Sequence, residues 1–432
     1  MRFLTAVFLT GICAVLAVVH PWIGILGWTL ISIMNPHRYA WSASTLPIAA
    51  IVAVATLIGL VVTRDRIRMV VSPVTLALLV FMIWMCVTLP FSFSVEPSAE
   101  MWKRVMKIDF MILVGIAALH SRKHVMALAW VLVVSVGIYG LKAGLFTIAT
   151  GGANRVWGPP DSFIEGNNEI GLALIMTIPL MRFLQLQQSS RWTRYSLTLL
   201  MILSALSALS TQSRGALLAI VAMAAMMWWR GSGKVALGAL LALAAAGLVA
   251  FMPEQWDTRM SSIVNYEQDS SALGRINAWT MAWNLAKDRF FGGGFDIYNP
   301  VIFSAYAPVP TDVHAAHSIY FQVLGEHGFI GLALFLLLWA LVWWTAGWLR
   351  REGRRETEST WAADLGAMCQ ASLAAYFVGG AFLSLAYFDL PYDLLLLVVV
   401  ARRWVEEKGW AQETASVKRV ASEPSFSIPS RS

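Results

Sequence analysis

Two histidines in one polar segment are the residues best placed for acid–base chemistry. His314 and His317 lie three positions apart, and Thr311 or Asp312 can cap a helix that starts just before them. We therefore expect both imidazoles in the first helical turns, where the helix macrodipole disfavours the charged form. A histidine that stays neutral at physiological pH can act as a general base, so this pair favours catalysis over a structural role.

Arginines at two further places could bind an anion. Arg214 occupies the polar corner Thr211–Gly215 between two apolar runs, where backbone N–H groups at the start of the next helix are exposed. A simple turn with an interfacial arginine remains the alternative there. Arg275 begins the segment 275–289, a predicted amphipathic helix that Gly292–Gly294 would end. The side chains predicted to share its apolar side are Ile276, Trp279, Trp283 and Ala286.

The composition requires a membrane around these residues. Of the 432 residues, 58% are hydrophobic and only 13% are charged, and the mean hydropathy is +0.65. These values exclude a water-soluble globular protein and predict an all-α polytopic membrane protein with about twelve transmembrane helices. The net charge of +7 comes mainly from arginines in connecting loops, so it does not indicate a nucleic-acid partner.

Apolar runs long enough to cross the bilayer divide the chain into four regions. We predict N-terminal transmembrane helices in 1–252, a small, mostly helical periplasmic domain in 253–317, C-terminal transmembrane helices in 318–404 and a disordered cytoplasmic tail in 405–432. His20-Pro21 interrupts the first run, which could form two short spans or one broken one. The other predicted spans are 46–63, 73–90, 108–120, 125–149, 168–186, 195–211, 214–229, 235–252, 318–349, 361–385 and 387–404.

Lysine and arginine gather in alternate loops, which fixes the predicted orientation. The positive-inside rule assigns these loops to the cytoplasm of a bacterial inner membrane, so the histidines and the segment 253–317 face the periplasm. The residues that carry the pattern are Arg64, Arg66, Arg68, Arg122, Lys123, Arg191, Arg194, Arg230, Lys234, Arg350, Arg351, Arg354, Arg355, Arg402 and Arg403.

Several cations lie on the opposite, outer side against this rule. Interfacial snorkelling could explain any one of them, but their number suggests a polyanionic partner such as a diphosphate or an anionic glycolipid. Asn167 or Asn168 can cap the following helix, and either could also bind sugar hydroxyls. The outer cations are Lys103, Arg104, Lys107, Lys142, Arg155, Arg214 and Arg275.

Several familiar catalytic motifs are missing. The sequence holds no Walker motif, no HExxH and no DxD-type acidic pair in the outer loops. We therefore expect no metal and no cofactor. Periplasmic chemistry lacks ATP and sugar nucleotides, so a glycan donor would arrive already activated in the membrane, and a polyprenyl-diphosphate carrier meets that need.

The order of these motifs resembles the O-antigen ligase and polymerase superfamily. The shared features are the Ser213-Arg214-Gly215 corner, the outer segment with Arg275 and the sequence HAAHSIYFQVLGEHGFIG over 314–331. The resemblance covers roughly 195–345. It implies a GT-C-like, metal-independent O-antigen ligase that moves a glycan from undecaprenyl diphosphate to lipid A–core oligosaccharide of lipopolysaccharide, with inversion of the anomeric carbon.

The resemblance also implies roles for individual residues. His317 looks like the base, with His314 as a second participant, and Arg214 and Arg275 look like the diphosphate ligands. Arg155 and Lys142 are expected to assist with the donor. Ser318 stands where the family often has Asn. The residues expected near the acceptor or behind the site are Ser318, Tyr320, Glu326 and Asn168.

Three other functions stay open at this point. A polymerase or a protein O-oligosaccharyltransferase would share these motifs and differ only in the acceptor. A lipid or sugar transporter would explain the helices and the intramembrane cations without chemistry, but it predicts an internal repeat that the sequence does not display. The expected partners are the lipid-linked glycan, the lipid A–core acceptor and membrane lipids, and the oligomeric state is undetermined.

Overall fold

The computed structural model describes residues 2–36, 47–63, 65, 67–152, 154–230 and 270–411. Some predictions lie outside these residues. They are the predicted span 235–252, the first part of the outer domain at 253–269, Arg64, Arg66, Lys234 and the tail from residue 412.

Every regular element in the described residues is a helix, which confirms the all-α prediction for this part of the chain. The first apolar run forms two helices with His20 between them, and Pro21 takes the first position of the second. The elements are α1 (Arg2–Val19), α2 (Pro21–Met34), α3 (Ile48–Val62), α4 (Pro73–Thr88), η2 (Leu89–Phe91), α5 (Val95–Ala118), α6 (Arg122–Thr150), α7 (Asn167–Leu186), α8 (Arg191–Ser210), α9 (Arg214–Arg230), α12 (Ser270–Asp288), α13 (Pro300–Tyr306), α14 (Ile319–Glu352), η4 (Thr357–Ser359), α15 (Thr360–Gly380) and α16 (Asp389–Glu406).

Five segments in the described residues are long and apolar enough to cross a membrane. They are Pro73–Phe91, α6, α7, α8 and α14, and shorter apolar helices accompany them. The chain is therefore a polytopic membrane protein, while the expected number of about twelve spans and the GT-C-like architecture stay predictions. α16 continues to Glu406, slightly beyond the boundary drawn at residue 404.

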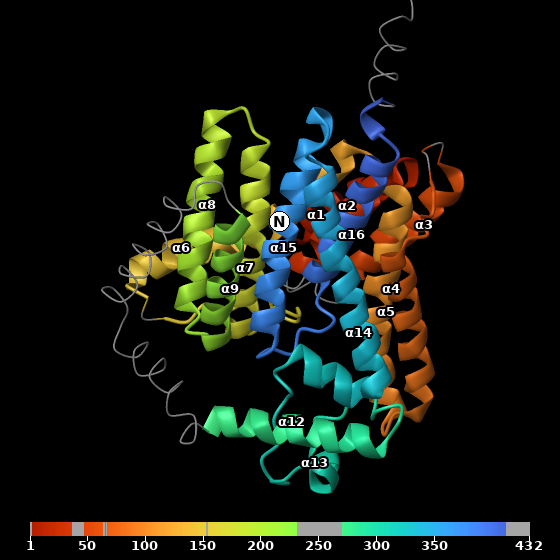
Figure 1. Cartoon of the computed structure of the whole chain (residues 1–432), viewed down its shortest axis with the longest axis vertical. Helices are drawn as coiled ribbons and strands as arrows, with labels where there is room; N and C mark the ends of the chain where they lie inside the picture. The colour runs from red at the N-terminus through yellow and green to blue at the C-terminus, as the bar shows by residue number, and fades with distance from the viewer. Residues whose placement is uncertain are drawn as a thin grey trace, which may run out of the picture.

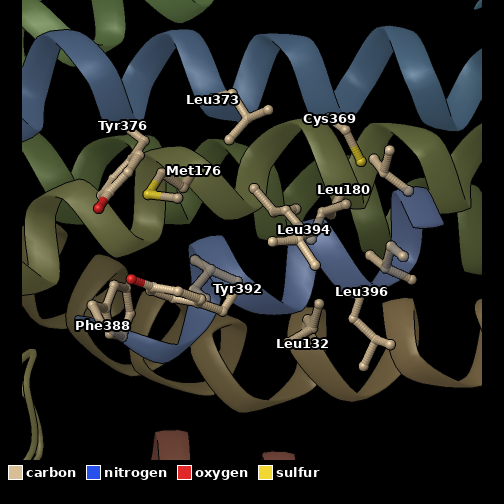
Figure 2. Packing of buried hydrophobic residues seen from close by; sticks show 14 of the residues in the cluster. Leu132, Met176, Leu180, Cys369, Leu373, Tyr376, Phe388, Tyr392, Leu394 and Leu396 are labelled. Atoms are coloured by element: carbon tan, nitrogen blue, oxygen red, sulfur yellow. The ribbon is translucent and has the colours of Figure 1, made fainter. Parts of the chain in front are cut away.

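The helix α16 forms the centre of the bundle. Nearly every side chain along it is buried, and it packs against α2, α4, α5, α6, α14 and α15. Figure 2 shows Tyr392, Leu394 and Leu396 of α16 between Leu132 of α6 and Leu373 of α15. The middle of α16, residues 394–401, is apolar on all sides, and a helical stretch of this kind belongs in a protein interior.

The basic loops meet at one end of the bundle. Arg68 forms an ion pair with Glu407 at 2.7 Å, and Arg122 donates to Gln187 Oε1 at 3.4 Å. Gln187 in turn donates to Asp364 at 3.0 Å. These contacts tie the loop with Arg68 to the end of α16, and the loops with Arg122 and Gln187 to the start of α15.

The other end carries the outer segment. Figure 1 shows α12 running across this end below the upright helices, with α13 beneath it. A small core between α12 and α13 holds the segment together, formed by Ala278, Met281, Leu285, Ile297, Ile302 and Phe303. The two-ended arrangement agrees with the charge pattern of the loops.

The predicted outer loop 90–107 is in large part helical. α5 begins at Val95, and its polar first half runs into the apolar second half without a break. Arg104 lies on this extension, where it donates to the carbonyl of Asp161 at 3.1 Å and packs over the ring of Phe163 at 3.9 Å. The apolar run in the sequence marks where hydrocarbon would end, but the helix itself continues into polar surroundings.

The predicted span 318–349 is broken at Gly328. Its φ of 69° and ψ of −173° lie in a region that only glycine occupies readily, so α14 consists of a short helix and a longer span. The freed carbonyls of Gly325 and Glu326 accept N–H groups of Gly293 and Gly294 at 2.9 and 3.0 Å. The three glycines at 292–294 therefore hold this break, while α12 already ends at Asp288.

Replacing Gly328 with alanine should destabilise the protein. The backbone strain alone would cost about 1–3 kcal/mol, and the added Cβ would lie 2.4 Å from the carbonyl oxygen of Phe290. Thermal unfolding in detergent checks this prediction. The matched control is Gly11→Ala in α1, where a Cβ meets nothing within 4 Å and should be neutral or stabilising by about 0.5–1 kcal/mol. Equal melting of the two variants would contradict the role of the break.

Candidate active site

His314 and His317 lie in an irregular segment and not in a helix. α14 begins at Ile319 with Ser318 as its N-cap, so the prediction that both histidines occupy the first helical turns is wrong. The physical reason is competition for the backbone. The carbonyl of Ala316 accepts the indole N–H of Trp279 at 2.6 Å, so it is bonded to α12 and not to a helix of its own.

α12 holds this segment through a second side chain. The Asn277 amide donates to the carbonyls of Val309 and Asp312 at 2.8 and 2.9 Å, and its oxygen accepts the N–H of Val309 at 2.9 Å. Trp279 also stacks on Phe321, with the ring centroids 5.1 Å apart. The buried side of α12 thus fixes the loop that carries the histidines.

His317 has a strained backbone that one neighbour holds. Its φ is 42°, which is uncommon for a residue with a side chain, and its N–H donates to Ser384 Oγ at 2.9 Å. Its Nδ1 is buried and has no hydrogen-bond partner among the described residues. A ligand hydroxyl could supply that partner, because an unsatisfied buried polar atom costs about 1–3 kcal/mol.

The imidazole of His317 is kept neutral. Its pKa is lowered from 6.5 to about 4, mainly by burial, with smaller contributions in the same direction from the positive charge of Arg275 and from the neighbouring His314. For His317 this pKa agrees with the predicted neutral form, but its main cause is burial, with the charge of Arg275 second, and not a helix macrodipole.

His314 packs on the start of α12. Its Nε2 lies 2.8 Å from Asp312 Oδ1, and a Cβ at position 274 would come within 2.3 Å of its Cδ2. Gly274 is therefore needed so that the imidazole can approach the helix beside Arg275. This contact places His314 against α12 directly before Arg275.

The corner with Arg214 is tied to the loop before α7. Ser210 Oγ donates to the carbonyl of Asn154 at 3.1 Å, and Asn167 donates to the carbonyl of Thr211 at 2.8 Å. Gln212 has a φ of 54°, which reverses the chain before Ser213 caps α9 by accepting the N–H of Ala216. Arg214 is thereby held, half-buried, at the first position of α9.

The turn between α15 and α16 brings the corner and the histidine together. Phe382 in this turn lies 3.5 Å from the place of a Cβ on Gly215, and its ring is 6.5 Å from that of Trp279. Two residues further on, Ser384 binds His317. Arg214 and His317 therefore border one turn, and the charge of Arg275 acts on His317 from α12.

The other predicted donor ligands divide into two cases. Arg155 lies beside the corner, where its Nε donates to Gln212 Oε1 at 3.3 Å. Lys142 is exposed on α6, two turns before that helix ends, and forms no hydrogen bond or ion pair with another described residue. No hydrogen bond or ion pair among the described residues ties Lys142 to the corner or to the histidine segment, so its expected role stays a prediction.

The predicted acceptor residues also differ in position. Ser318 is buried directly after His317 and begins α14, while Tyr320 donates to the carbonyl of Phe377 at 2.9 Å. Glu326 accepts the hydroxyl of Tyr387 at 2.5 Å inside the bundle. Tyr320 and Glu326 thus tie α14 to its neighbours.

Asn168 is half-buried in the first turn of α7. The next residue in the chain is Glu169. The expected cap by Asn167 or Asn168 is wrong, because Gly166 is the N-cap and no side chain caps the helix. Asn167 binds the corner instead, and Asn168 has no hydrogen-bond partner in the described residues. Arg275 lies close enough to Glu169 for their charges to interact.

Sequence reasoning missed Ser384, Phe382 and Glu169. All three belong to helix ends or to a short turn inside apolar runs, and a single Ser or Phe there gives no recognisable signal. Among the described residues, no three His, Cys, Asp or Glu side chains are grouped as a metal site.

These features define a multi-pass membrane protein with a half-buried histidine and arginines at one end of its helices. Residues 199–336 match the family model described as O-antigen ligase, and this match supports a member of the O-antigen ligase/polymerase family. Members of this family transfer glycosyl groups. Residues 1–189 match a second model, described as a family of unknown function (DUF5935). No curated protein matches the chain.

The pH dependence of His317 labelling should reveal its neutral state. Because the pKa is about 4 and not 6.5, carbethoxylation of His317 should persist from neutral pH to about 5 and be lost near 4. Mass spectrometry of the labelled peptide measures this. The same difference means that acidification from 6.5 towards 4 destabilises the fold, since only the unfolded state takes up the proton.

Arg275 can be tested in the same experiment. Arg275→Met removes one cause of the low pKa of His317, so the pH midpoint of labelling should rise towards 6.5. Arg275→Lys keeps the positive charge and should leave the midpoint near that of the parent protein. A midpoint at 6.5 in the unaltered protein would contradict the neutral histidine.

Proposed function

We propose that this protein is an O-antigen ligase that works on the periplasmic side of the bacterial inner membrane. It transfers a glycan from undecaprenyl diphosphate to a sugar hydroxyl of lipid A–core oligosaccharide. The observation that carries the proposal is a neutral, half-buried His317 beside Arg275, at the end of the bundle opposite the basic loops. The family match supports it, because residues 199–336 contain Arg214, Arg275 and His317.

His317 would start the reaction by accepting the proton of the acceptor hydroxyl. The hydroxyl oxygen then forms a bond to the anomeric carbon from the face opposite the diphosphate. The bond between that carbon and the diphosphate oxygen breaks, and undecaprenyl diphosphate leaves. One displacement of this kind inverts the anomeric carbon, and the proton remains on the imidazole until solvent takes it.

The leaving diphosphate gains negative charge as the bond breaks. Arg214 and Arg275 are half-buried and border the same region as His317, so their guanidinium groups could bind its oxygens and stabilise that charge. Arg155 stands next to the corner and could assist. A base and an electrostatic stabiliser suffice for this chemistry, so the proposed mechanism uses no metal and no cofactor.

Arg275 would act at two stages of the reaction. Without ligand, its charge lowers the pKa of His317 and keeps the base unprotonated. When a diphosphate binds, its negative charge offsets that of Arg275, so the pKa of His317 rises as the donor arrives. The basicity of His317 would then be greatest when the donor is bound.

His317→Ala should abolish transfer. General-base catalysis contributes about 100- to 10,000-fold, and no other described histidine occupies this position. The measurement uses purified protein, a lipid-linked glycan and lipid A–core oligosaccharide, without added metal or nucleotide. His314→Gln is the matched histidine control and should retain more activity. Near-normal ligation by well-folded His317→Ala protein would sink the general-base assignment.

The product of the unaltered protein separates the alternatives. Glycan on lipid A–core supports the ligase. A longer lipid-linked polymer would identify a polymerase, and a glycosylated Ser or Thr would identify a protein O-oligosaccharyltransferase. Movement of the intact lipid-linked glycan without any transfer would favour a transporter and overturn the enzymatic proposal.

Arg214→Ala and Arg275→Ala should each lower transfer on the order of a hundredfold or more, because preorganised charge stabilisation is worth about 3–4 kcal/mol. Lys142→Ala is the matched cation comparison, since Lys142 is exposed on α6 and has no hydrogen bond or ion pair to the corner or the histidine segment, and it should lose less activity than either arginine variant. The same reconstituted assay measures all three. Equal losses for Lys142 and Arg275 would indicate a general effect of net charge and contradict a defined diphosphate site.

A further inference from the structure

The helix α12 has two apolar faces, and the bundle covers only one of them. The covered face comprises Gly274, Asn277, Ala278, Met281, Ala282 and Leu285. The other face is formed by Leu273, Ile276 and Trp283, which are 46%, 44% and 46% exposed. The predicted single apolar side is therefore divided, because Trp279 and Ala286 turn towards the protein while Ile276 and Trp283 point away.

The outward face continues into the surface of the membrane spans. The ring of Trp283 meets that of Phe329, the first residue of the long part of α14, with centroids 5.3 Å apart. Phe290, just after α12, meets Trp84 of α4 at 6.1 Å. Phe329 is itself 42% exposed. Many apolar side chains further along α14 and on α4 are exposed as well. One uninterrupted apolar surface thus runs from the spans onto α12.

The position of α12 fits this continuity. It runs across the end of the bundle, crosswise to the upright spans (Figure 1). Its outward side also carries exposed Lys287, next to the apolar residues. A helix that lies in the plane of a bilayer surface has this combination of an apolar face, a tryptophan and a basic residue.

We infer that α12 is an interfacial helix whose outward face, Leu273, Ile276 and Trp283, contacts the acyl chains and headgroups of the bilayer leaflet at this end of the protein. Burial of these side chains in lipid removes apolar surface that would otherwise face water. Lys287 would lie at the level of anionic headgroups. The protein therefore meets this leaflet through α12 as well as through its spans.

This lipid contact sets the height of Arg275, and here the inference rests on the proposed function. Arg275 directly precedes Ile276, so a lipid-bound Ile276 keeps the guanidinium at the level of the headgroups. The diphosphate of a donor anchored by a polyprenyl chain lies at the same depth. The contact would thus align an anion-binding group with a membrane-bound anion without any movement of the spans.

Depth-dependent fluorescence quenching tests the contact directly. Single-cysteine variants Ile276→Cys and Trp283→Cys are made in a chain with Cys13, Cys86 and Cys369 replaced, labelled with an environment-sensitive dye and placed in nanodiscs. The discs contain phosphatidylethanolamine and phosphatidylglycerol with a nitroxide on the acyl chain. Leu336→Cys in α14 is the lipid-exposed control, and Ser304→Cys on α13 is the water-exposed control.

We expect strong quenching at 276, 283 and 336 and little at 304. Quenching at 276 and 283 no greater than at 304 would overturn the inference. If a second copy of the chain covers this face, the labels would be shielded from lipid and their signal would change with protein concentration, which would also overturn it.

The inference and the proposed function can fail separately. Quenching needs no substrate, so lipid contact without glycan transfer would leave the interfacial helix intact and reject the ligase. A second measurement connects the two. Ile276→Ser should raise the KM for the lipid-linked donor several-fold with little change in kcat, whereas Val301→Ser on α13, which is 74% exposed, should change neither.

Discussion

A backbone contact between two glycine positions holds the outer segment to the bundle. A Cβ on Gly292 would lie 2.6 Å from the carbonyl oxygen of Glu326, so the turn after α12 approaches the break in α14 more closely than any side chain permits. Because α14 is broken there, its first part can lie along the end of the bundle while the rest crosses it. The loop with His317 is then anchored between α12 and the turn 381–388.

The electrostatics of the site follow from this arrangement. The loop is half-buried, and burial is the main reason why the pKa of His317 is low. Arg275 comes from a different helix and adds to the effect, so neutrality of the histidine depends on the packing of α12. A loose outer segment would expose the imidazole to water and separate it from the guanidinium. Fold stability and the protonation state of the base are therefore coupled.

Hydrophobic patterning predicted much of the architecture. The apolar runs correspond closely to α3, α4, α6, α7, α8 and α9, because a helix in hydrocarbon must be apolar over its full length. The sequence did not predict that the polar half of α5 is helical or that the segment with His314 and His317 is irregular. In both places the backbone lies outside the apolar runs, where neighbouring helices decide whether it is helical.

The sequence by itself determined the class of protein, the ends at which the basic loops gather and the residue types able to do acid–base and anion chemistry. These properties depend on the residue types and on their order along the chain, and they do not depend on how the helices pack. Only the tertiary structure decided that Arg155 bonds to the corner, that Ser384 holds His317 and that α12 has a second apolar face. Such facts depend on contacts between residues far apart in the chain, and no local pattern records them.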